Sequence, residues 1–508
     1  MNRKIIGALL ITLLVAIGVI MFLQSPWYKS GEMALPKGVK DGETSILEVS
    51  AQEKGDSPVK KFVLTAEEKQ WQISEGKKVS AWTYNGTVPG EPLRVTEGDV
   101  VQVMLKNELD VPVTIHWHGV LLPNKMDGIP GLTQDAVQPG ESFTYEFIAN
   151  DAGTYWYHSH QQSSIQVDKG LYGSLVIEEK EKEYERDEVF ILDEWAVNQE
   201  KEDMSNMGGM MMGAMGGDGE ADTKQMYDTF TVNGKAGNAI KPLTMEAEEK
   251  ARLRFVNAGY QVHRLVFPEG SMRVIATDAE KVVSEDNNSN VLEIAPGERV
   301  DVEFTKPYQE TVLIGQEQNV EHAEDMIIPI VSEKDQSHHQ TASLAPQAGV
   351  AKGISYGSQK RIFEETPEPD VTYDMDLNMG MSMGEGMSFQ INDKTFPDTP
   401  PIKVKEGDIV KVTLRNKGRM NHPMHLHGHR FQVNSKNGEK LDDPIVKDLI
   451  HVKPGEEYVI YFKADNLGEW LFHCHDNNHA ARGMVTIVDY EEVYSPFGLG
   501  GQEENQPN

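Results

Sequence analysis

The sequence predicts an all-β protein built from three β-sandwich domains in tandem. Two observations support this prediction: one chain pattern occurs three times, and runs of alternating apolar and polar residues are bounded by Gly, Pro and Asn. Alternation with a period of two is typical of short antiparallel strands, and many such strands in one unit form a β-sandwich. A chain of 508 residues also agrees with about three domains of ordinary size.

Each copy of the pattern opens with an Asn-Gly or Asn-Asp turn, continues to an alternating run that ends in asparagine, and reaches a Pro-Gly-Glu turn. The copies open at Asn85, Asn233 and Asn392, their runs end at Asn107, Asn257 and Asn416, and their later turns begin at Pro139, Pro296 and Pro454. We therefore expect domains at residues 45–182, 183–335 and 369–490. Residues 336–368, rich in Ser, Gln, Ala, Gly and Pro, are expected to form a linker, and the tail at 491–508 to be disordered from Gly498.

Residues 1–44 precede the repeats and contain an uncharged apolar run at 5–23, directly after Arg3 and Lys4. At ~1.5 Å per residue such a run can cross the core of a bilayer. Basic residues before it favour an N-terminus inside the cell and the domains outside. We expect a membrane anchor with extracellular domains; the alternative is a cleaved signal peptide, which would release a secreted protein.

The composition excludes some classes of protein. A formal net charge of −32 argues against nucleic acid as a partner. Cys474 is the one cysteine of the chain, so a disulfide scaffold is excluded. A lone cysteine can be a buried small hydrophobe, but that reading leaves the histidines on both sides of Cys474 without a reason.

The stretch around Cys474 has the composition of a blue copper site. Cys474 lies between His473 and His475, and His479 and Met484 follow. A cysteine thiolate, two imidazoles and a weak thioether are the ligands of such a centre. If this stretch is a strand, successive side chains point to opposite faces. Cys474 can then bind one metal while its two neighbours face others, which predicts a through-bond path for electrons.

Three further histidine clusters precede this stretch: His116-Trp-His118, His158-Ser-His160, and His422-Pro-Met-His425-Leu-His427. In this order the four clusters resemble the multicopper oxidases (laccases, copper-efflux oxidases and relatives), over nearly all the chain after the N-terminal segment. The resemblance implies three cupredoxin-like Greek-key β-sandwich domains and four copper ions. It also implies an enzyme that oxidises its substrate by single electrons and reduces O2 to water.

The resemblance also implies which residues bind which copper. Type-1 copper would take His422, Cys474 and His479 with axial Met484, and type-2 copper His116 and His425. The paired type-3 coppers would take His118, His158, His160, His427, His473 and His475. The middle domain has only His263 after Asn257, so we expect the metals where the first and third domains meet. Zinc is a poor alternative, because a closed zinc site needs about four ligands.

Proton transfer needs a carboxylate near the metals. Asp127 matches a family position with this role, although an aspartate before glycine is also typical of a turn. Many relatives carry a second carboxylate where this chain has Ala480, and we consider Asp476 as its substitute.

Two methionine-rich stretches bear on the substrate. Residues 204–215 combine methionines with glycines that disfavour helix and strand. Thioethers select Cu(I), and similar segments in relatives favour Cu(I) oxidation and copper tolerance; the alternative is a disordered linker. Residues 373–387 place Tyr373 and several methionines at alternate positions, which predicts a half-buried strand opening the third domain rather than a copper-binding segment.

The sequence thus favours an exported, membrane-tethered and monomeric multicopper oxidase whose substrates are Cu(I) or phenolic and aromatic amine compounds. One alternative is a general laccase with no role in copper homeostasis, and another is a non-catalytic copper-sequestering protein. A copper nitrite reductase would have two such domains per chain and no His-Cys-His stretch. A relative that had lost its metals would lack some of the twelve ligands.

Overall fold

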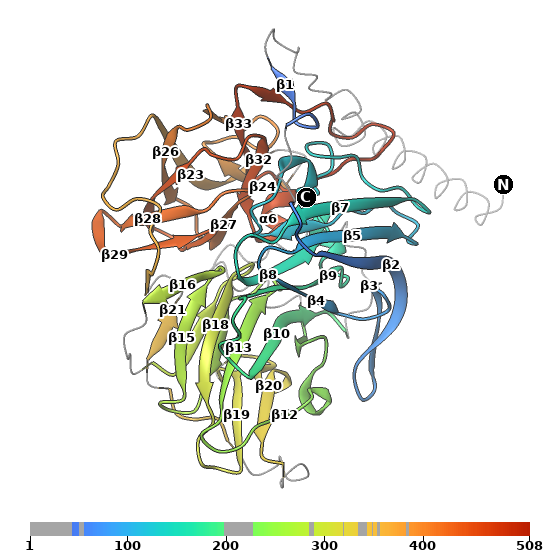
Figure 1. Ribbon diagram of the computed structural model, residues 1–508, viewed down its shortest axis with the longest axis vertical. Coiled ribbons are helices and arrows are strands. Elements are labelled where there is room, and N and C mark those ends of the chain that lie inside the picture. Colours follow the sequence, from blue (N-terminus) through green and yellow to red (C-terminus); the bar gives the residue numbers. More distant parts are fainter. Residues whose placement is uncertain are drawn as a thin grey trace, which may run out of the picture.

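The computed structural model describes residues 43–49, 55–197, 227–283, 289–318, 320–333, 343–347, 349–352, 356–382 and 386–508. Across these residues most regular structure is strand, arranged in three β-rich domains (Figure 1). This confirms the all-β prediction. None of the helices in the described ranges is long and apolar enough to cross a membrane. The apolar run at 5–23 and the methionine-rich residues 204–215 lie outside the described residues.

The described part of the first domain pairs two sheets. One contains, in spatial order, β3 (Lys77–Tyr84), β2 (Val59–Ser74), β5 (Val100–Asn107) and β7 (Ser142–Ile148). The other contains β4 (Gly90–Thr96), β9 (Tyr172–Glu178), β8 (Gly153–His158) and β6 (His116–His118). Since β6 is the edge strand and pairs with β8, His116 lies opposite His158 at one end of this sheet.

The middle domain is a larger pair of sheets. The first contains β11 (Thr229–Val232), β10 (Arg186–Trp195), β13 (Lys250–Asn257), β18 (Arg299–Thr305), β15 (Met272–Thr277), β16 (Glu280–Val283) and β22 (Gly357–Ser358). The second contains β12 (Leu243–Thr244), β20 (Ile327–Val331), β19 (Thr311–Gln316), β14 (His263–Val266), β17 (Val291–Ile294) and β21 (Val350–Lys352). Two of these strands, β21 and β22, come from the segment expected to be a linker, and they extend the sheets by pairing with β17 and β16.

The third domain repeats the two-sheet plan. One sheet contains β24 (Gly386–Ile391), β23 (Val371–Ser382), β26 (Ile409–Asn416), β31 (Glu457–Lys463), β28 (Phe431–Lys436) and β29 (Glu439–Lys447). The other contains β25 (Ile402–Val404), β33 (Val485–Tyr490), β32 (Glu469–Cys474), β27 (His422–Leu426) and β30 (Leu449–Val452). The predicted opening strand is confirmed as β23, where Met375 and Leu377 are buried and Met381 is exposed.

The C-terminal tail is bound to the first domain, so the expected disorder from Gly498 is wrong. Asn505 is buried, and its Oδ1 accepts the backbone N–H of Ala136 at 2.8 Å. The side chain of Gln161 donates to the carbonyl of Glu504 at 2.7 Å. A polar, glycine-containing tail suggests solvation, but here its amides are matched by partners on a distant segment that composition does not reveal.

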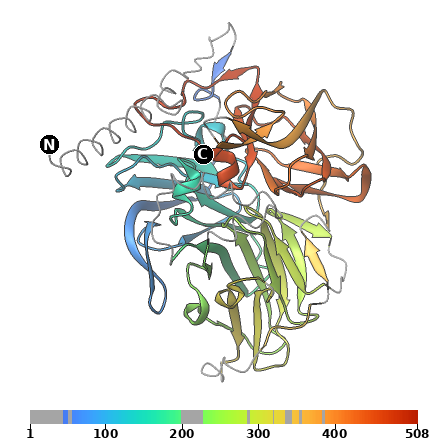
Figure 2. The same cartoon turned by 180° about the vertical axis from the view of Figure 1, so that it is seen from behind.

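The domain arrangement brings two sheet ends together. The first and third domains lie side by side, and the middle domain lies against both (Figure 1, Figure 2). The ends of β6 and β8 face the ends of β27 and β32 across the boundary, as the stacked rings of His116 and His427 show. A short helix, α6 (Asn477–Ala481), follows β32 at the same place.

Candidate metal centres

The first centre gathers around Cys474, at the end of β32. The Sγ of Cys474 lies 3.8 Å from Nδ1 of His422, which begins β27, and 3.6 Å from Nδ1 of His479 in α6. Met484 is buried beside them, and its carbonyl accepts the backbone N–H of Cys474 at 3.0 Å. The four residues predicted for a type-1 site therefore come together in one buried place.

Local structure orients His479 within this centre. Asp476 caps α6, because its side chain accepts the backbone N–H groups of Asn478 and His479. The ring of Phe389 stacks on the His479 ring, with centroids 3.8 Å apart. Burial lowers the pKa of His479 to about 3, so the imidazole is neutral and its nitrogen lone pair is available to a metal.

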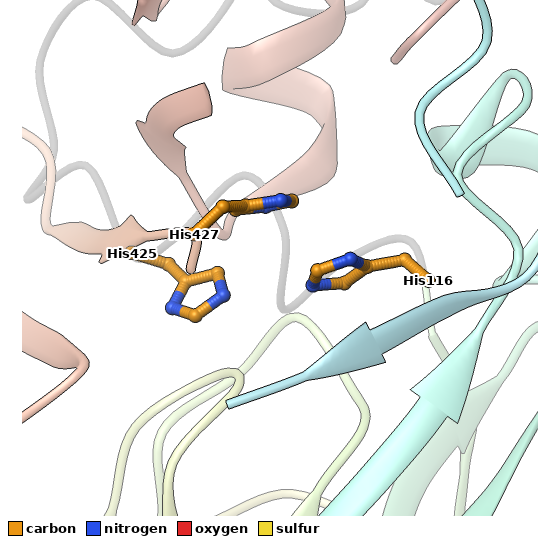
Figure 3. A group of neighbouring side chains, drawn as sticks. All are labelled: His116, His425 and His427. Atoms are coloured by element: carbon orange, nitrogen blue, oxygen red, sulfur yellow. The ribbon is translucent and has the colours of Figure 1, made fainter. Parts of the chain in front are cut away.

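The second centre is a cluster of eight imidazoles at the boundary between the first and third domains. The rings of His116 and His427 stack with centroids 3.9 Å apart, and those of His118 and His425 at 3.7 Å. Each stacked pair takes one ring from each domain. Figure 3 shows His425 and His427 on the third-domain side of the boundary, with His116 facing them from the first-domain side. The remaining members, His158, His160, His473 and His475, lie around these pairs.

Backbone carbonyls fix the orientation of several of these rings. The Nδ1 atoms of four imidazoles lie 2.9–3.0 Å from carbonyl oxygens, in the pairs His116 with Asp127, His158 with Ser159, His425 with Asp448, and His473 with Cys474. A neutral ring that donates from Nδ1 presents the lone pair of Nε2 to the cluster. For His116, His158 and His425 that buried Nε2 atom has no hydrogen-bond partner among the described residues.

Buried nitrogens without partners are costly unless something binds them. Burial, together with the neighbouring imidazoles, lowers the pKa well below 6.5 for His118, His158, His160, His427, His473 and His475. Uncharged imidazole is the form that binds metal. The possible ligand atoms of His116, His118 and His158 lie within 4.8 Å of one another, and so do those of His160, His427 and His473. The donor set fits several closely spaced metal ions.

Strand β32 joins the two centres. Cys474 contacts His422 and His479, whereas the Nε2 of His473 lies 3.0 Å from that of His427 and the ring of His475 lies 4.9 Å from that of His118. Successive strand residues point to opposite faces. The structure therefore places the sulfur in one centre and both flanking imidazoles in the other, as the sequence predicts.

The two acidic candidates occupy different places. Asp127 is buried, with Oδ2 2.9 Å from Nδ1 of His427 and Oδ1 3.2 Å from Nδ1 of His116, so its carboxylate lies at the eight-histidine cluster. Asp476 lies on the side of the first centre, 3.4 Å from Nε2 of His479. Burial raises the pKa of Asp476 to about 6.

Two residues at the cluster are not predicted from the sequence. Asp448 is buried beside His425 and His118, and it forms an ion pair with Arg299 of the middle domain. Neither residue belongs to a histidine cluster or to a recognisable motif, and they are 149 positions apart in the chain. Only the fold brings them to the site.

A cavity of about 600 Å³ opens beside His479, between the middle and third domains. Tyr260 and Met420 are part of its wall, together with Asp476. Its two strongly basic side chains are paired with carboxylates of the same wall: Arg264 with Glu317 at 2.7 Å and Lys453 with Glu293 at 2.8 Å. A small molecule in this cavity would lie next to an imidazole of the first centre.

Comparison with known proteins agrees with this geometry. Three multicopper oxidase family models match residues 65–182, 187–312 and 366–492. Multicopper oxidase MmcO of Mycobacterium tuberculosis is 30% identical over 439 residues, which cover 82% of this chain and 84% of that protein. A copper resistance protein A homolog of Pseudomonas syringae pv. tomato is 27% identical, over 85% of this chain and 92% of that protein.

Solved structures agree as well. The crystal structure of a multicopper oxidase from Pseudomonas thermotolerans has a TM-score of 0.66 to this chain at 26% identity, and the match covers 86% of this chain and 100% of that one. The family models match all three domains, and the solved structure shares their fold. Both findings agree with the two buried centres that β32 joins. This chain belongs to the multicopper oxidase family.

Proposed function

We propose that the protein oxidises a small donor one electron at a time at a type-1 copper and reduces O2 to water at a three-copper cluster. One observation carries this proposal: β32 places Cys474 in the centre next to the cavity and its neighbours His473 and His475 in the eight-histidine cluster. The type-1 ligands would be His422, Cys474, His479 and Met484. The eight remaining histidines would hold one type-2 and two type-3 ions, which gives four coppers per chain.

Copper in these positions would supply one-electron redox chemistry and the four electrons that O2 needs. The protein supplies the path between the centres. His473 donates from Nδ1 to the carbonyl of Cys474 at 2.9 Å, which adds a hydrogen-bonded route to the covalent one. The backbone N–H of His475 donates to the carbonyl of Pro423, next to His422. These contacts hold the sulfur and both imidazoles in a fixed relation.

We further propose that Asp127 handles protons at the cluster. Its carboxylate lies within hydrogen-bonding distance of His427, in a buried site where bulk water does not compete. A carboxylate at this position can hold a proton and pass it to reduced oxygen. Asp476 instead lies beside His479 at the cavity. This position favours a role in binding the electron donor. It does not favour replacement of the second carboxylate that many relatives carry where this chain has Ala480.

The cavity supports a cationic or neutral donor. Its wall carries four carboxylates, on Glu293, Glu317, Glu321 and Asp476, against the two cations Arg264 and Lys453. Met420 adds a thioether, a soft ligand that suits Cu(I). Cu(I) and aromatic amines are therefore the favoured substrates, with phenols next.

The thioether of Met420, the methionines of residues 204–215 and the relatives named for copper resistance support a role in copper tolerance. We also propose that the N-terminal run at 5–23 exports the chain and anchors it as a monomer with its domains outside the cell. The competing functions are a laccase that acts on organic donors alone and a protein that only sequesters copper.

The experiment is steady-state O2 uptake by the copper-loaded protein with Cu(I), with a phenol and with an aromatic amine. We expect uptake with all three and the highest kcat/KM with Cu(I). A matched chain lacking residues 204–215 should lose rate with Cu(I) and keep its rate with the phenol. Equal Cu(I) rates in the two chains would remove the role of that segment, and no O2 uptake with any donor would leave copper sequestration.

A further inference from the structure

Two aspartates contact the eight-histidine cluster in matching ways. The carbonyl of Asp127 accepts from Nδ1 of His116, and the carbonyl of Asp448 from Nδ1 of His425, both at 2.9 Å. Each carboxylate then faces a histidine of the other domain. Oδ2 of Asp127 lies 2.9 Å from Nδ1 of His427, and Oδ1 of Asp448 lies 3.6 Å from Nε2 of His118.

The two carboxylates differ in their partners. Asp448 forms a two-pronged ion pair with the guanidinium of Arg299, whose Nη1 donates to Oδ1 at 2.7 Å while Nη2 donates to Oδ2. Both residues are almost fully buried. For Asp127, the described residues within ion-pair distance are His116 and His427 alone. Arg299 therefore fixes the carboxylate of Asp448, whereas the carboxylate of Asp127 faces only imidazoles among the described residues.

Arg299 comes from the middle domain, which supplies none of the predicted ligands, yet it contacts all three domains. It donates from Nε to the carbonyl of Thr154 in the first domain at 3.3 Å and lies 3.2 Å from Asp278 in its own. Asp278 is held in turn by Lys447, the last residue of β29, which directly precedes Asp448. The planar fork of an arginine matches a carboxylate in one orientation. The position of Asp448 is thus set by Arg299, which is held in turn by groups of the first and middle domains.

The residues around the Arg299–Asp448 ion pair are tightly packed. A Cβ at Gly119, the residue after His118, would overlap the Arg299 guanidinium and lie 2.7 Å from Oδ2 of Asp448. A Cβ at Gly297, two residues before Arg299, would lie 2.8 Å from Cγ of His475. Glycine at 119 lets the ion pair lie against the backbone next to His118, and glycine at 297 leaves room for the ring of His475.

We infer that Arg299 is a positioning residue: through Asp448 it sets the orientation of His425 and His118, so the middle domain controls the copper site between the other two. This inference rests on the proposed assignment of His425 to type-2 copper. Without Arg299, Asp448 is a buried carboxylate lacking its counter-charge, and it turns toward the neighbouring imidazoles. Loss of a group that orients a ligand typically lowers metal affinity by roughly 10- to 100-fold.

The test compares Arg299→Met with Arg254→Met in the copper-loaded protein. Arg254 is an equally buried arginine of the middle domain that pairs with Asp187 at 2.6 Å and donates to the side chain of Thr154. Among the described residues, none of the hydrogen bonds or ion pairs of Arg254 involves a histidine of the cluster. The measurements are copper per chain, the hyperfine splitting of the type-2 signal in electron paramagnetic resonance, and the blue absorption of the type-1 centre.

We expect Arg299→Met to lose type-2 copper or to change its hyperfine splitting while the blue absorption stays as in the wild type. Arg254→Met should keep all three measurements. An unchanged type-2 signal in Arg299→Met overturns the inference, and so does an equal change in Arg254→Met, because both outcomes reduce Arg299 to general packing.

A second variant covers a failure of Arg299→Met to fold. Arg299→Lys keeps the positive charge but loses the two-pronged guanidinium contact with Asp448, so the type-2 hyperfine splitting should shift by less than in Arg299→Met. An unchanged spectrum contradicts the inference. A wild-type protein that binds fewer than four coppers, or has no type-2 signal, would instead contradict the proposed copper arrangement, independently of Arg299.

Discussion

The middle and third domains place a histidine at the same point of the same framework and use it differently. In each domain an asparagine at a strand end donates from Nδ2 to two carbonyls, and the key position lies two residues past the first of them. The asparagines are Asn107, Asn257 and Asn416, the first acceptors are Val111, Gln261 and Met420, and the key positions are Val113, His263 and His422. All three side chains at the key positions are fully buried.

In the middle domain, protein groups occupy the space around the key histidine. The Nε2 of His263 lies 2.8 Å from Oε1 of Glu194, and both residues are fully buried. Glu194 also accepts the backbone N–H groups of Tyr260 and Gln261. In the third domain, His422 instead faces Cys474, and its buried Nε2 has no hydrogen-bond partner among the described residues.

The first domain fills the equivalent space in a third way. Ser159 lies between His158 and His160 as Cys474 lies between its two histidines, and its Oγ donates to Gln166 Oε1 at 2.6 Å. The amide of Gln166 donates on to the carbonyl of Pro112. The comparison teaches that the backbone framework is shared, and that a few side chains decide whether this position offers ligands to a metal or is closed by other protein groups.

The largest expected effect comes from replacing Cys474 of the third domain with serine, the residue that the first domain has at the equivalent position 159. Cys474→Ser removes the thiolate, so the blue absorption should vanish and O2 uptake should fall by roughly 10⁴-fold, the scale seen when residues that act as a unit lose one member. Copper analysis should still find the three ions of the cluster. Normal turnover by this variant would contradict the whole account of the path through β32.

The next effect separates the role of Asp127 from that of the proposed ligands His116 and His427, which it contacts. Asp127→Asn keeps a polar group beside His427 but cannot donate a carboxyl proton, so O2 uptake should drop about 100-fold, at the lower end of general acid–base contributions. The copper content and the blue absorption should stay unchanged. If the loaded variant consumes O2 at the full rate, Asp127 is a turn residue only.

A moderate effect is expected in the middle domain, where Glu194 occupies the space next to His263. Glu194→Gln removes the charge beside His263 and weakens hydrogen bonds to two backbone N–H groups, so the free energy of unfolding should fall by about 2 kcal/mol. Denaturant titration measures this loss, with copper spectra as the control. A change in the type-1 absorption would show that this position is coupled to the metal centres, against the comparison above.

The smallest effect concerns Met484, the proposed axial ligand. Met484→Leu should leave the copper bound and the protein blue, while the type-1 reduction potential rises because the thioether no longer stabilises the oxidised ion. Redox titration of the blue absorption gives the potential directly. A lower potential, or loss of the blue absorption, would show that Met484 has another role than the predicted one.

The sequence predicts the all-β class and the repeat well, because both depend on local alternation and turn residues. It also predicts that His422, Cys474, His479 and Met484 would meet. The linker and the tail were predicted less well, since strands β21 and β22 and the bound Asn505 depend on partners far away in the chain. A polar composition alone does not distinguish a solvated segment from one whose amides find partners.

By itself, the sequence determined the donor set, since copper chemistry needs thiolate, imidazole and thioether groups at set intervals along strands. The tertiary structure decided which uncharged and charged groups surround those donors. The pairing of Arg299 with Asp448 and the carboxylate-rich cavity beside His479 join segments from different domains, and the closure of His263 by Glu194 joins two distant strands of the middle domain. Such contacts follow from how the sandwiches pack, and no local pattern of residues records them.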